Sequence, residues 1–333
     1  MHTICDARAV RIAGLGTYLP ERRVTSAELD AVFGVEPGWT ARATGVTERR
    51  YVGGETTEQM AACAGRSALQ AAGILPNEVD MVIAAAASRR QLIPCTAVFV
   101  QRELGLPEGR SVCFDVDATC LSWLVALDIA ASFVCAGRAS AVLVVTSETA
   151  SCSLNPRAPE SAGLFGDAAV AAVVTPSTNE SGIGQVLFET HSSGACLAEF
   201  PGGGTLHHPN DSATCPEMNM FRMQGRAIFK MALRVVPPFI DRFMDESGAR
   251  RDTFDAVVPH QASKMGLDVL TERFGFRAEQ IITNLATRGN CIAASIPLAL
   301  AEAVGSGRIA RGNRVLLIGT GAGLTIGAMD LVF

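Results

Sequence analysis

A chain of 333 residues, 48% of them apolar and with a net charge of −5, is long enough to bury a large core. This charge argues against a general nucleic-acid surface, and no apolar run approaches the roughly 20 residues of a membrane-spanning helix. The first residues also lack the charged-then-apolar layout of a signal peptide. We therefore expect a cytoplasmic globular protein that binds neither nucleic acid nor membrane.

Predicted strands and helices alternate along the whole chain. Several strand candidates are unbroken apolar runs, which is typical of strands that are covered on both faces. The expected strands cover residues 10–16, 80–88, 112–116, 141–148, 168–175, 182–190, 255–260, 280–284, 314–321 and 324–333. The expected helices cover residues 56–73, 95–104, 121–137, 221–247, 262–275 and 292–305. This alternation predicts an α/β fold.

The two halves of the chain repeat the same order of landmarks. Asp80 and Asp255 each begin an apolar strand, and Gly137 and Gly307 each follow a helix and precede a further strand. The members of each pair are about 170 to 175 positions apart, a spacing that indicates an internal duplication. The loose self-similarity of any α/β protein is the alternative.

Duplication predicts two similar βαβαβ halves, which we place at residues 1–175 and 176–333. Cys120 and Asn290 then occupy near-equivalent helix starts, one in each half. The pseudo-symmetry of such a pair would bring these two side chains together.

Cys120 stands between an apolar strand and an apolar helix. Asp117 and Thr119 precede it, and the following helix carries no charge before Asp128. Unpaired N–H groups and the dipole at a helix start favour a thiolate, and they can also stabilise an oxyanion. These features indicate a nucleophile, although packing in the core is the commoner fate of such a cysteine.

His260 and Asn290 also follow predicted strands. Taken singly, His260 is compatible with an ordinary loop histidine, and Asn290 with an ordinary helix cap. Both lie at carboxyl-side strand ends, where open α/β sheets place their ligands. Together with Cys120 they indicate covalent acyl chemistry.

The other cysteines and histidines match no standard metal-binding pattern. The chain has ten cysteines but no C-x-x-C pair, and several of them resemble small buried hydrophobes. His207 and His208, with Cys215 nearby, form the one metal candidate, but their spacing fits no standard ligand set. We therefore expect no metal and no cofactor.

The glycine-rich segment 319–327 follows a predicted strand and leads into another strand. A dinucleotide-binding loop needs its glycines to open a helix, so that interpretation is poor. We expect instead a tight turn whose backbone N–H groups face an oxyanion.

Taken together, these segments resemble β-ketoacyl-[acyl-carrier-protein] synthase III, of the thiolase superfamily. The resemblance runs from VRIAGLGTYLPERRVT near the start to the final phenylalanine. Its most specific segments are GWTARATGVTERRY (38–51), DVDATCLSWLVAL (115–127), LFGDAAVAAVV (164–174), FRMQGRAIFK (221–230), VVPHQAS (257–263), NLATRGNCIAASIPLAL (284–300) and GTGAGLTIG (319–327). The resemblance implies a thiolase-like fold, in which the duplicated halves form a layered αβαβα sandwich, and a homodimer.

The resemblance also implies a role for each candidate residue. Cys120 would take an acyl group from an acyl thioester, normally acyl-CoA, and hold it. His260 and Asn290 would bind the thioester carbonyl of malonyl-acyl carrier protein and stabilise the enolate that decarboxylation leaves. The backbone N–H groups of Cys120 and Ala322 would form the oxyanion hole. The product would be a β-ketoacyl thioester, as in fatty acid biosynthesis.

Four further positions concern substrate binding. Trp39 matches a tryptophan that stacks on the coenzyme A adenine, and Arg42 stands beside the position of a family arginine. Thr320 replaces a phenylalanine often found near the malonyl site. Lys264 is adjacent to a position that often carries a basic carrier-docking residue. These departures leave the donor, the acceptor and the chain preference open.

The segment 88–94 aligns with an acyl-pocket loop that usually lacks two arginines. Arg89 or Arg90 facing the acyl channel, with Ile93 in the same loop, would favour a polar or carboxylated acyl group. Two solvated surface arginines are the alternative, and the commoner one.

Three other functions fit parts of the pattern. A close rival keeps the acyl-enzyme but transfers the group to an alcohol or amine of a small molecule, with His260 as general base. A cysteine hydrolase shares the order Cys, His, Asn, but its local signature around the cysteine is absent. A noncatalytic partner of an active synthase is disfavoured because all three polar residues are present.

Overall fold

The first half of the chain builds a five-stranded mixed sheet in a computed structural model that describes residues 7–333. Its strand order is β1-β7-β6-β4-β5. The bounds are β1 (Val10–Tyr18), β4 (Met81–Ala85), β5 (Val112–Val116), β6 (Val142–Glu148) and β7 (Ala168–Pro176). β4 pairs in parallel with β5 and β6, whereas β7 runs antiparallel to β6 and β1. The apolar strands β4, β6 and β7 are almost wholly buried, as predicted from their composition.

The second half repeats this arrangement with four strands, in the order β8-β13-β12-β11. The bounds are β8 (Gly182–Thr190), β11 (Ala256–Pro259), β12 (Arg314–Gly321) and β13 (Thr325–Val332). The predicted strand 280–284 is wrong as a regular strand, because Ile281 forms only a single bridge to Val257. The fifth strand of the first sheet therefore has a one-residue counterpart in the second. The change of sheet falls between β7 and β8, near the predicted division of the chain at residue 175.

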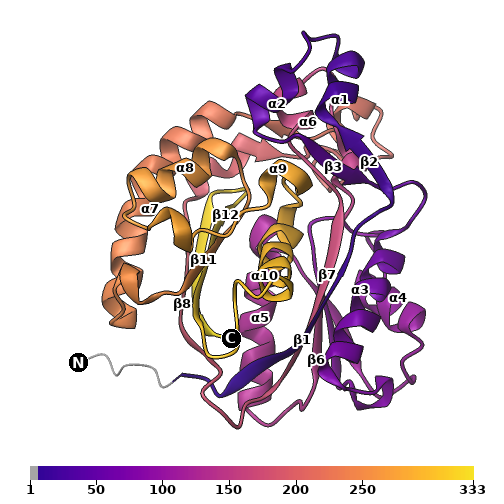
Figure 1. Cartoon of the computed structure of the whole chain (residues 1–333). Coiled ribbons are helices and arrows are strands. Elements are labelled where there is room, and N and C mark those ends of the chain that lie inside the picture. The colour runs from indigo at the N-terminus through magenta and orange to yellow at the C-terminus, as the bar shows by residue number, and fades with distance from the viewer. Residues whose placement is uncertain (1–6) are drawn as a thin grey trace.

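Helices form three layers around the two sheets (Figure 1). α5 (Ser122–Cys135) and α10 (Ser295–Gly305) lie between the sheets and share one apolar core with both of them. α3 (Thr57–Ala72) and α4 (Thr96–Leu104) cover the outer face of the first sheet. α7 (Gly225–Ser247) and α8 (Lys264–Glu272) cover the outer face of the second. The predicted αβαβα sandwich is confirmed.

The remaining elements are short and cover the top of the molecule in the view of Figure 1. They are β2 (Arg22–Thr25), α1 (Ser26–Phe33), α2 (Trp39–Thr44), β3 (Glu48–Tyr51), α6 (Pro159–Ala162), β9 (Ala198–Glu199), β10 (Arg222–Met223) and α9 (Leu285–Arg288). β10 occupies the start of the predicted helix 221–247, so that helix begins four residues later than expected. Within residues 7–333, no helix is long and apolar enough to cross a membrane.

Two matching turns lead into the central helices. A single 3₁₀ turn precedes each helix, at Thr119–Leu121 and at Ile292–Ala294, and its first residue has φ of 51° and 49° respectively. Ser122 and Ser295 begin the helices, and each hydroxyl accepts a hydrogen bond of 2.9 Å from the backbone N–H four residues earlier. The duplication predicted from landmark spacing thus extends to backbone conformation and capping.

Candidate active site

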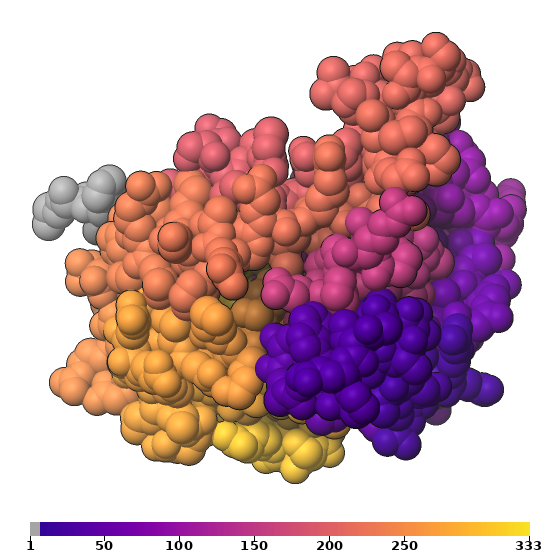
Figure 2. Space-filling view, turned by 90° about the horizontal axis from the view of Figure 1, so that it is seen from above, coloured from indigo at the N-terminus to yellow at the C-terminus, as the bar shows by residue number. Residues whose placement is uncertain are grey.

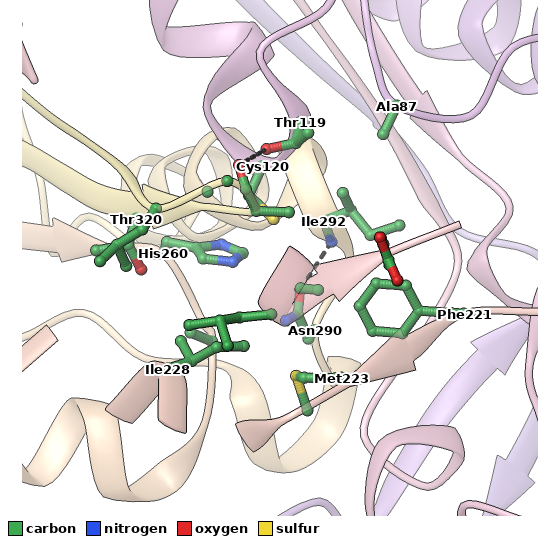
Figure 3. Close-up of a pocket in the computed structure, with 18 of the residues that line it drawn as sticks. Ala87, Thr119, Cys120, Phe221, Met223, Ile228, His260, Asn290, Ile292 and Thr320 are labelled. Carbon is green, nitrogen blue, oxygen red and sulfur yellow. Dashed lines mark hydrogen bonds between the residues drawn. The ribbon is translucent and has the colours of Figure 1, made fainter. Parts of the chain in front are cut away.

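The three residues singled out by the sequence line one cavity of about 220 Å³. Cys120 lies in the 3₁₀ turn before α5, His260 directly follows β11, and Asn290 precedes the turn before α10. Their side chains face the same space in Figure 3, with Phe221 and Met223 at its opposite side. Most of the other lining side chains are apolar, so the few polar groups act in a weakly solvated setting.

The turn that carries Cys120 is tied down by polar contacts at both of its ends. Asp117 accepts a hydrogen bond of 3.0 Å from the Thr119 backbone N–H, and Ser122 bonds to the backbone on the other side. The left-handed φ of 51° at Thr119 is unfavourable for a β-branched residue and persists only where its surroundings enforce it. Cys120 is therefore presented to the cavity by a rigid, strained turn.

The Cys120 thiol is not stabilised as a thiolate, contrary to the expectation from its helix start. Burial raises the pKa of Cys120 to about 12, and the negative charge of Glu148 acts in the same direction. The N–H groups at the turn oppose this effect without overcoming it. Desolvation outweighs the helix dipole here, so the Cys120 thiol is neutral in the site as it stands.

The glycine-rich turn between β12 and β13 lies directly against the Cys120 turn. The backbone N–H groups of Ala322 and of Cys120 itself both favour negative charge on the Cys120 sulfur. A Cβ on Gly321 would lie 2.6 Å from Thr119 Oγ1, so only glycine permits this approach. The predicted tight turn is present, and it places the Ala322 N–H group beside the N–H group of Cys120.

His260 is a buried, neutral imidazole. Desolvation lowers the pKa of His260 to about 4, and its Nδ1 has no hydrogen-bond partner among residues 7–333. A Cβ on Gly319 would lie 2.7 Å from the His260 Cβ, so β12 supports the imidazole closely from one side. A neutral imidazole both donates one hydrogen bond and accepts one.

Asn290 has its amide group oriented by the backbone. Its Oδ1 accepts a hydrogen bond of 2.9 Å from the Ile292 N–H, as the dashed line in Figure 3 shows. This contact requires an acceptor, so the amide oxygen takes that position and the NH₂ group remains free to donate into the cavity. Leu164 and Gly166 hold the Asn290 backbone by hydrogen bonds on both sides.

The symmetry relation between the two halves differs from the one predicted. Asp117 bonds to the N–H two residues onward just as Asn290 does, and both stand two residues before a left-handed position. Asn290 is therefore the counterpart of Asp117, and Cys120 is the counterpart of Ala293. The side chains of Cys120 and Asn290 line the same cavity. Asn290, however, lies three residues before Ala293, the position that the pseudo-symmetry pairs with Cys120.

Glu148 is a buried carboxyl group beside the site, and no sequence motif pointed to it. It ends β6 and accepts hydrogen bonds of 2.9 Å from each of the Ala87 and Ser88 N–H groups, and a longer one from Ala293. Burial raises the pKa of Glu148 to about 7. This carboxyl group joins the first half of the chain to the start of α10. The one available signal was a carboxylate that closely follows the apolar run AVLVV.

Trp39 and Arg42 lie outside the cavity, on α2. Arg42 is exposed and pairs with Glu36. Gly45, at the end of α2, approaches the beginning of α8 so closely that an added Cβ would lie 2.8 Å from the Lys264 Cβ. Lys264 is exposed and pairs with Asp268 at 2.6 Å. The end of α2 therefore lies against the beginning of α8, and Figure 2 shows a hollow between the indigo and orange segments that contain them.

Thr320 lines the cavity, whereas Arg89, Arg90 and Ile93 do not. Arg89 pairs with Asp117 at 2.7 Å. Arg90 pairs with Glu58 and stacks over the Phe99 ring. Ile93 is 84% exposed. The prediction that an arginine of this loop faces the acyl channel is not met within the single chain, because both guanidinium groups are held by carboxylates outside the cavity.

His207, His208 and Cys215 lie on the mostly exposed segment 201–217, which projects from the body of the molecule in Figure 2. His208 Nδ1 accepts a hydrogen bond from the Asn210 N–H. In the described part of the chain, no group of three or more His, Cys, Asp or Glu side chains could hold a metal ion.

Family models match the two parts of the chain that carry these residues. The model of the 3-oxoacyl-[acyl-carrier-protein (ACP)] synthase III family matches residues 114–194. The model of the C-terminal part of the same family matches residues 244–333. Cys120 falls within the first match, and His260 and Asn290 within the second.

Similar proteins share this family over nearly the whole chain. The β-ketoacyl-[acyl-carrier-protein] synthase III of Aquifex aeolicus is 34% identical over 96% of this chain and 98% of its own. The Desulfitobacterium hafniense enzyme is also 34% identical, over 96% of both chains.

Solved structures agree with these matches. The synthase III of Aquifex aeolicus has a TM-score of 0.88 at 33% identity, covering 97% of this chain and 100% of its own. The priming β-ketosynthase of the R1128 polyketide pathway has a TM-score of 0.89 at 30% identity, covering 99% and 98%. With the Cys, His and Asn cavity on a thiolase-like fold, the chain belongs to the 3-oxoacyl-[acyl-carrier-protein] synthase III family of acyltransferases.

Proposed function

We propose that this chain catalyses a decarboxylative Claisen condensation between an acyl group held on Cys120 and a malonyl thioester. The observation that carries the proposal is the convergence of Cys120, His260 and Asn290 on one apolar cavity, with a neutral imidazole and an oriented amide beside the thiol. This arrangement supplies a nucleophile and separate donors for a second carbonyl group.

In the first half-reaction, the Cys120 sulfur attacks the carbonyl carbon of an acyl-CoA or acyl-carrier-protein thioester. The oxygen gains negative charge, which the N–H groups of Cys120 and Ala322 stabilise without reorganising. The carbon–sulfur bond to the donor breaks, and the thiol proton of Cys120 ends on the departing thiol. Because that proton must leave a buried thiol, we assign the neutral His260 imidazole as its transient acceptor.

In the second half-reaction, the malonyl thioester carbonyl accepts hydrogen bonds from His260 and the Asn290 NH₂ group. Loss of carbon dioxide leaves an enolate whose oxygen these donors stabilise. Its α-carbon attacks the acyl carbon on Cys120, the carbon–sulfur bond breaks, and the Cys120 thiolate takes up a proton. The product is a β-ketoacyl thioester.

The surroundings of the cavity support further assignments within this proposal. Ala262 lines the cavity two residues before Lys264, and α2 lies beside that segment. We assign the coenzyme A moiety to Trp39 and Arg42 on α2, and the carrier protein to the surface around Lys264. No metal or cofactor takes part in the steps above. Acyl-CoA and carrier-protein thioesters as substrates imply reaction in the cytoplasm.

Intact-mass spectrometry after incubation with a panel of acyl thioesters tests the first half-reaction. We expect a mass increase equal to one acyl group in the wild-type chain and none in Cys120→Ala. Malonyl-carrier protein added to the acylated enzyme should then release carbon dioxide and yield a β-ketoacyl product. Acyl transfer to an alcohol or amine without carbon dioxide release would replace this proposal with the rival function.

A further inference from the structure

A second cavity, here named the inner cavity, is lined in part by His260. It has a volume of about 100 Å³ and lies between α7, α8 and the outer face of the second sheet. Apolar side chains form most of its lining, among them Phe229, Leu233, Leu267 and Phe274. Among the described residues 7–333, no charged side chain lines it, so its chemistry suits an alkyl group and excludes a carboxylate.

The inner cavity adjoins the active-site cavity. His260, Ala262 and Thr320 line both of them, whereas Cys120 lines only the first. The partition between the two spaces is thus made of one imidazole and two small side chains. A group that is bonded close to a carbonyl held by His260 therefore lies next to the inner cavity, whereas the acyl chain on Cys120 begins on the other side.

We propose that the inner cavity binds an alkyl substituent on the α-carbon of the malonyl-type thioester. This inference rests on the proposed function, because it assumes that His260 holds the thioester carbonyl. The α-carbon is bonded directly to that carbonyl, so its substituent lies beside His260, where the inner cavity begins. An apolar cavity on the order of 150 Å³ accommodates a benzene molecule. The inner cavity is smaller, at about 100 Å³, so the substituent that it can hold is small.

The same bonds form and break as with a malonyl thioester. An alkylmalonyl thioester loses carbon dioxide, and its α-carbon forms one bond to the acyl carbon of Cys120. The bond from that carbon to the Cys120 sulfur breaks, and the sulfur takes up a proton. The product is a β-ketoacyl thioester that carries the alkyl group on its α-carbon.

The test presents malonyl, methylmalonyl, ethylmalonyl and butylmalonyl thioesters separately to acylated wild-type enzyme and measures products by mass spectrometry. We expect α-branched products at rates within about tenfold of the malonyl rate for at least one substituent. If the enzyme condenses the malonyl thioester but accepts none of the substituted thioesters, this inference alone is overturned. An acyl-enzyme that condenses with none of the four would instead overturn the proposed function.

Two variants locate the substituent. Ala232→Leu fills the inner cavity from α7, so the kcat/KM ratio of substituted to plain malonyl thioester should fall about tenfold or more. Leu233→Ala enlarges the cavity and should shift the preference toward the longer substituent. Ala227→Leu, on the same helix but lining neither cavity, should leave the ratio unchanged. Acylation of Cys120 reports that each variant is folded, and a ratio insensitive to both cavity changes contradicts the inference.

Discussion

At the scale of single residues, the site depends on groups that burial keeps uncharged. Burial holds Cys120 as a thiol and His260 as a neutral imidazole, and it raises the pKa of Glu148 to about 7. An uncharged thiol and an uncharged imidazole avoid the cost of burying separated charges in an apolar cavity. In the proposed reaction, charge develops only as the bonds change, where the backbone and Asn290 donors are already in place.

The lowered pKa of His260 makes stability fall on acidification. The unfolded chain binds a proton to this imidazole below its ordinary pKa of 6.5, whereas the folded chain does so only near 4. The unfolded state therefore binds more protons between these values, and stability falls as the pH drops through this window. From pH 7 to pH 5 we expect a loss of about 2 kcal/mol from this residue. Urea unfolding of the wild type and His260→Asn at both pH values measures it, and equal losses in the two proteins would contradict it.

At the scale of elements, close backbone approach between β1 and α3 sets the position of the outer helix layer. A Cβ added at Gly16 would lie 2.2 Å from the Ala64 carbonyl oxygen, and one at Gly14 would lie 2.3 Å from that of Ala68. Neither backbone atom can rotate away as a side chain could. Glycine at these two positions therefore allows α3 to pack directly on the strand.

Substitution at Gly16 should consequently be costly. Gly16→Ala forces β1 and α3 apart, so we expect a loss of about 3 kcal/mol or more in the free energy of unfolding. Gly305→Ala is the matched control, because an added Cβ there meets nothing within 4 Å and lies in the last turn of α10. We expect it to be neutral or stabilising by up to about 1 kcal/mol. Chemical denaturation compares the two, and similar stabilities would show that α3 can move freely.

At the scale of the whole molecule, the free edge of the first sheet is suited to a second copy of the chain. β5 pairs only with β4 in the described part of the chain, and Val112 on it is 59% exposed. Leu92 and Ile93, in the loop before the adjacent helix α4, are exposed as well. An unpaired edge beside exposed apolar side chains favours association. We propose a homodimer through this edge.

Val112→Lys tests that assembly. A lysine on the edge strand would bury an unpaired charge at the interface, so the dimer dissociation constant should rise about tenfold or more. Val32→Lys, at a valine on α1 that is 67% exposed, is the matched control and should leave the mass in solution unchanged. Sedimentation velocity at micromolar concentration reports the mass, and a single-chain wild type would refute the dimer.

The sequence predicts the parts of this molecule that depend on local pattern. Cys120, His260 and Asn290 each follow a predicted strand, and the structure places all three in one cavity. The thiolate prediction for Cys120 was wrong, because burial depends on the tertiary environment and outweighs the helix dipole. Glu148 was missed because the donors that surround it come from Ala87, Ser88 and Ala293, which lie far from it in sequence.

The strand prediction for residues 280–284 failed for a related reason. The run QIITN has the composition of a strand, but within residues 7–333 its pairing with β11 is limited to the bridge at Ile281 and a hydrogen bond of 2.9 Å from the Ile282 N–H to the Val257 carbonyl oxygen. The inner cavity was likewise beyond prediction, because its lining comes from α7, α8, β12 and β13 together. Cavities and strand pairings that form between distant segments leave no periodic pattern of apolar residues in the sequence.

The shared central layer has a consequence for the synthesis of this protein on the ribosome. α10 begins at Ser295, 173 positions after α5 begins at Ser122, and the two helices belong to one apolar core. At roughly 5–20 residues per second, the ribosome needs roughly 9–35 s to make the intervening chain. During that interval the nascent first half exposes an apolar face that α10 and most strands of the second sheet cover only later. A nascent chain in this condition is a natural client for a ribosome-associated chaperone.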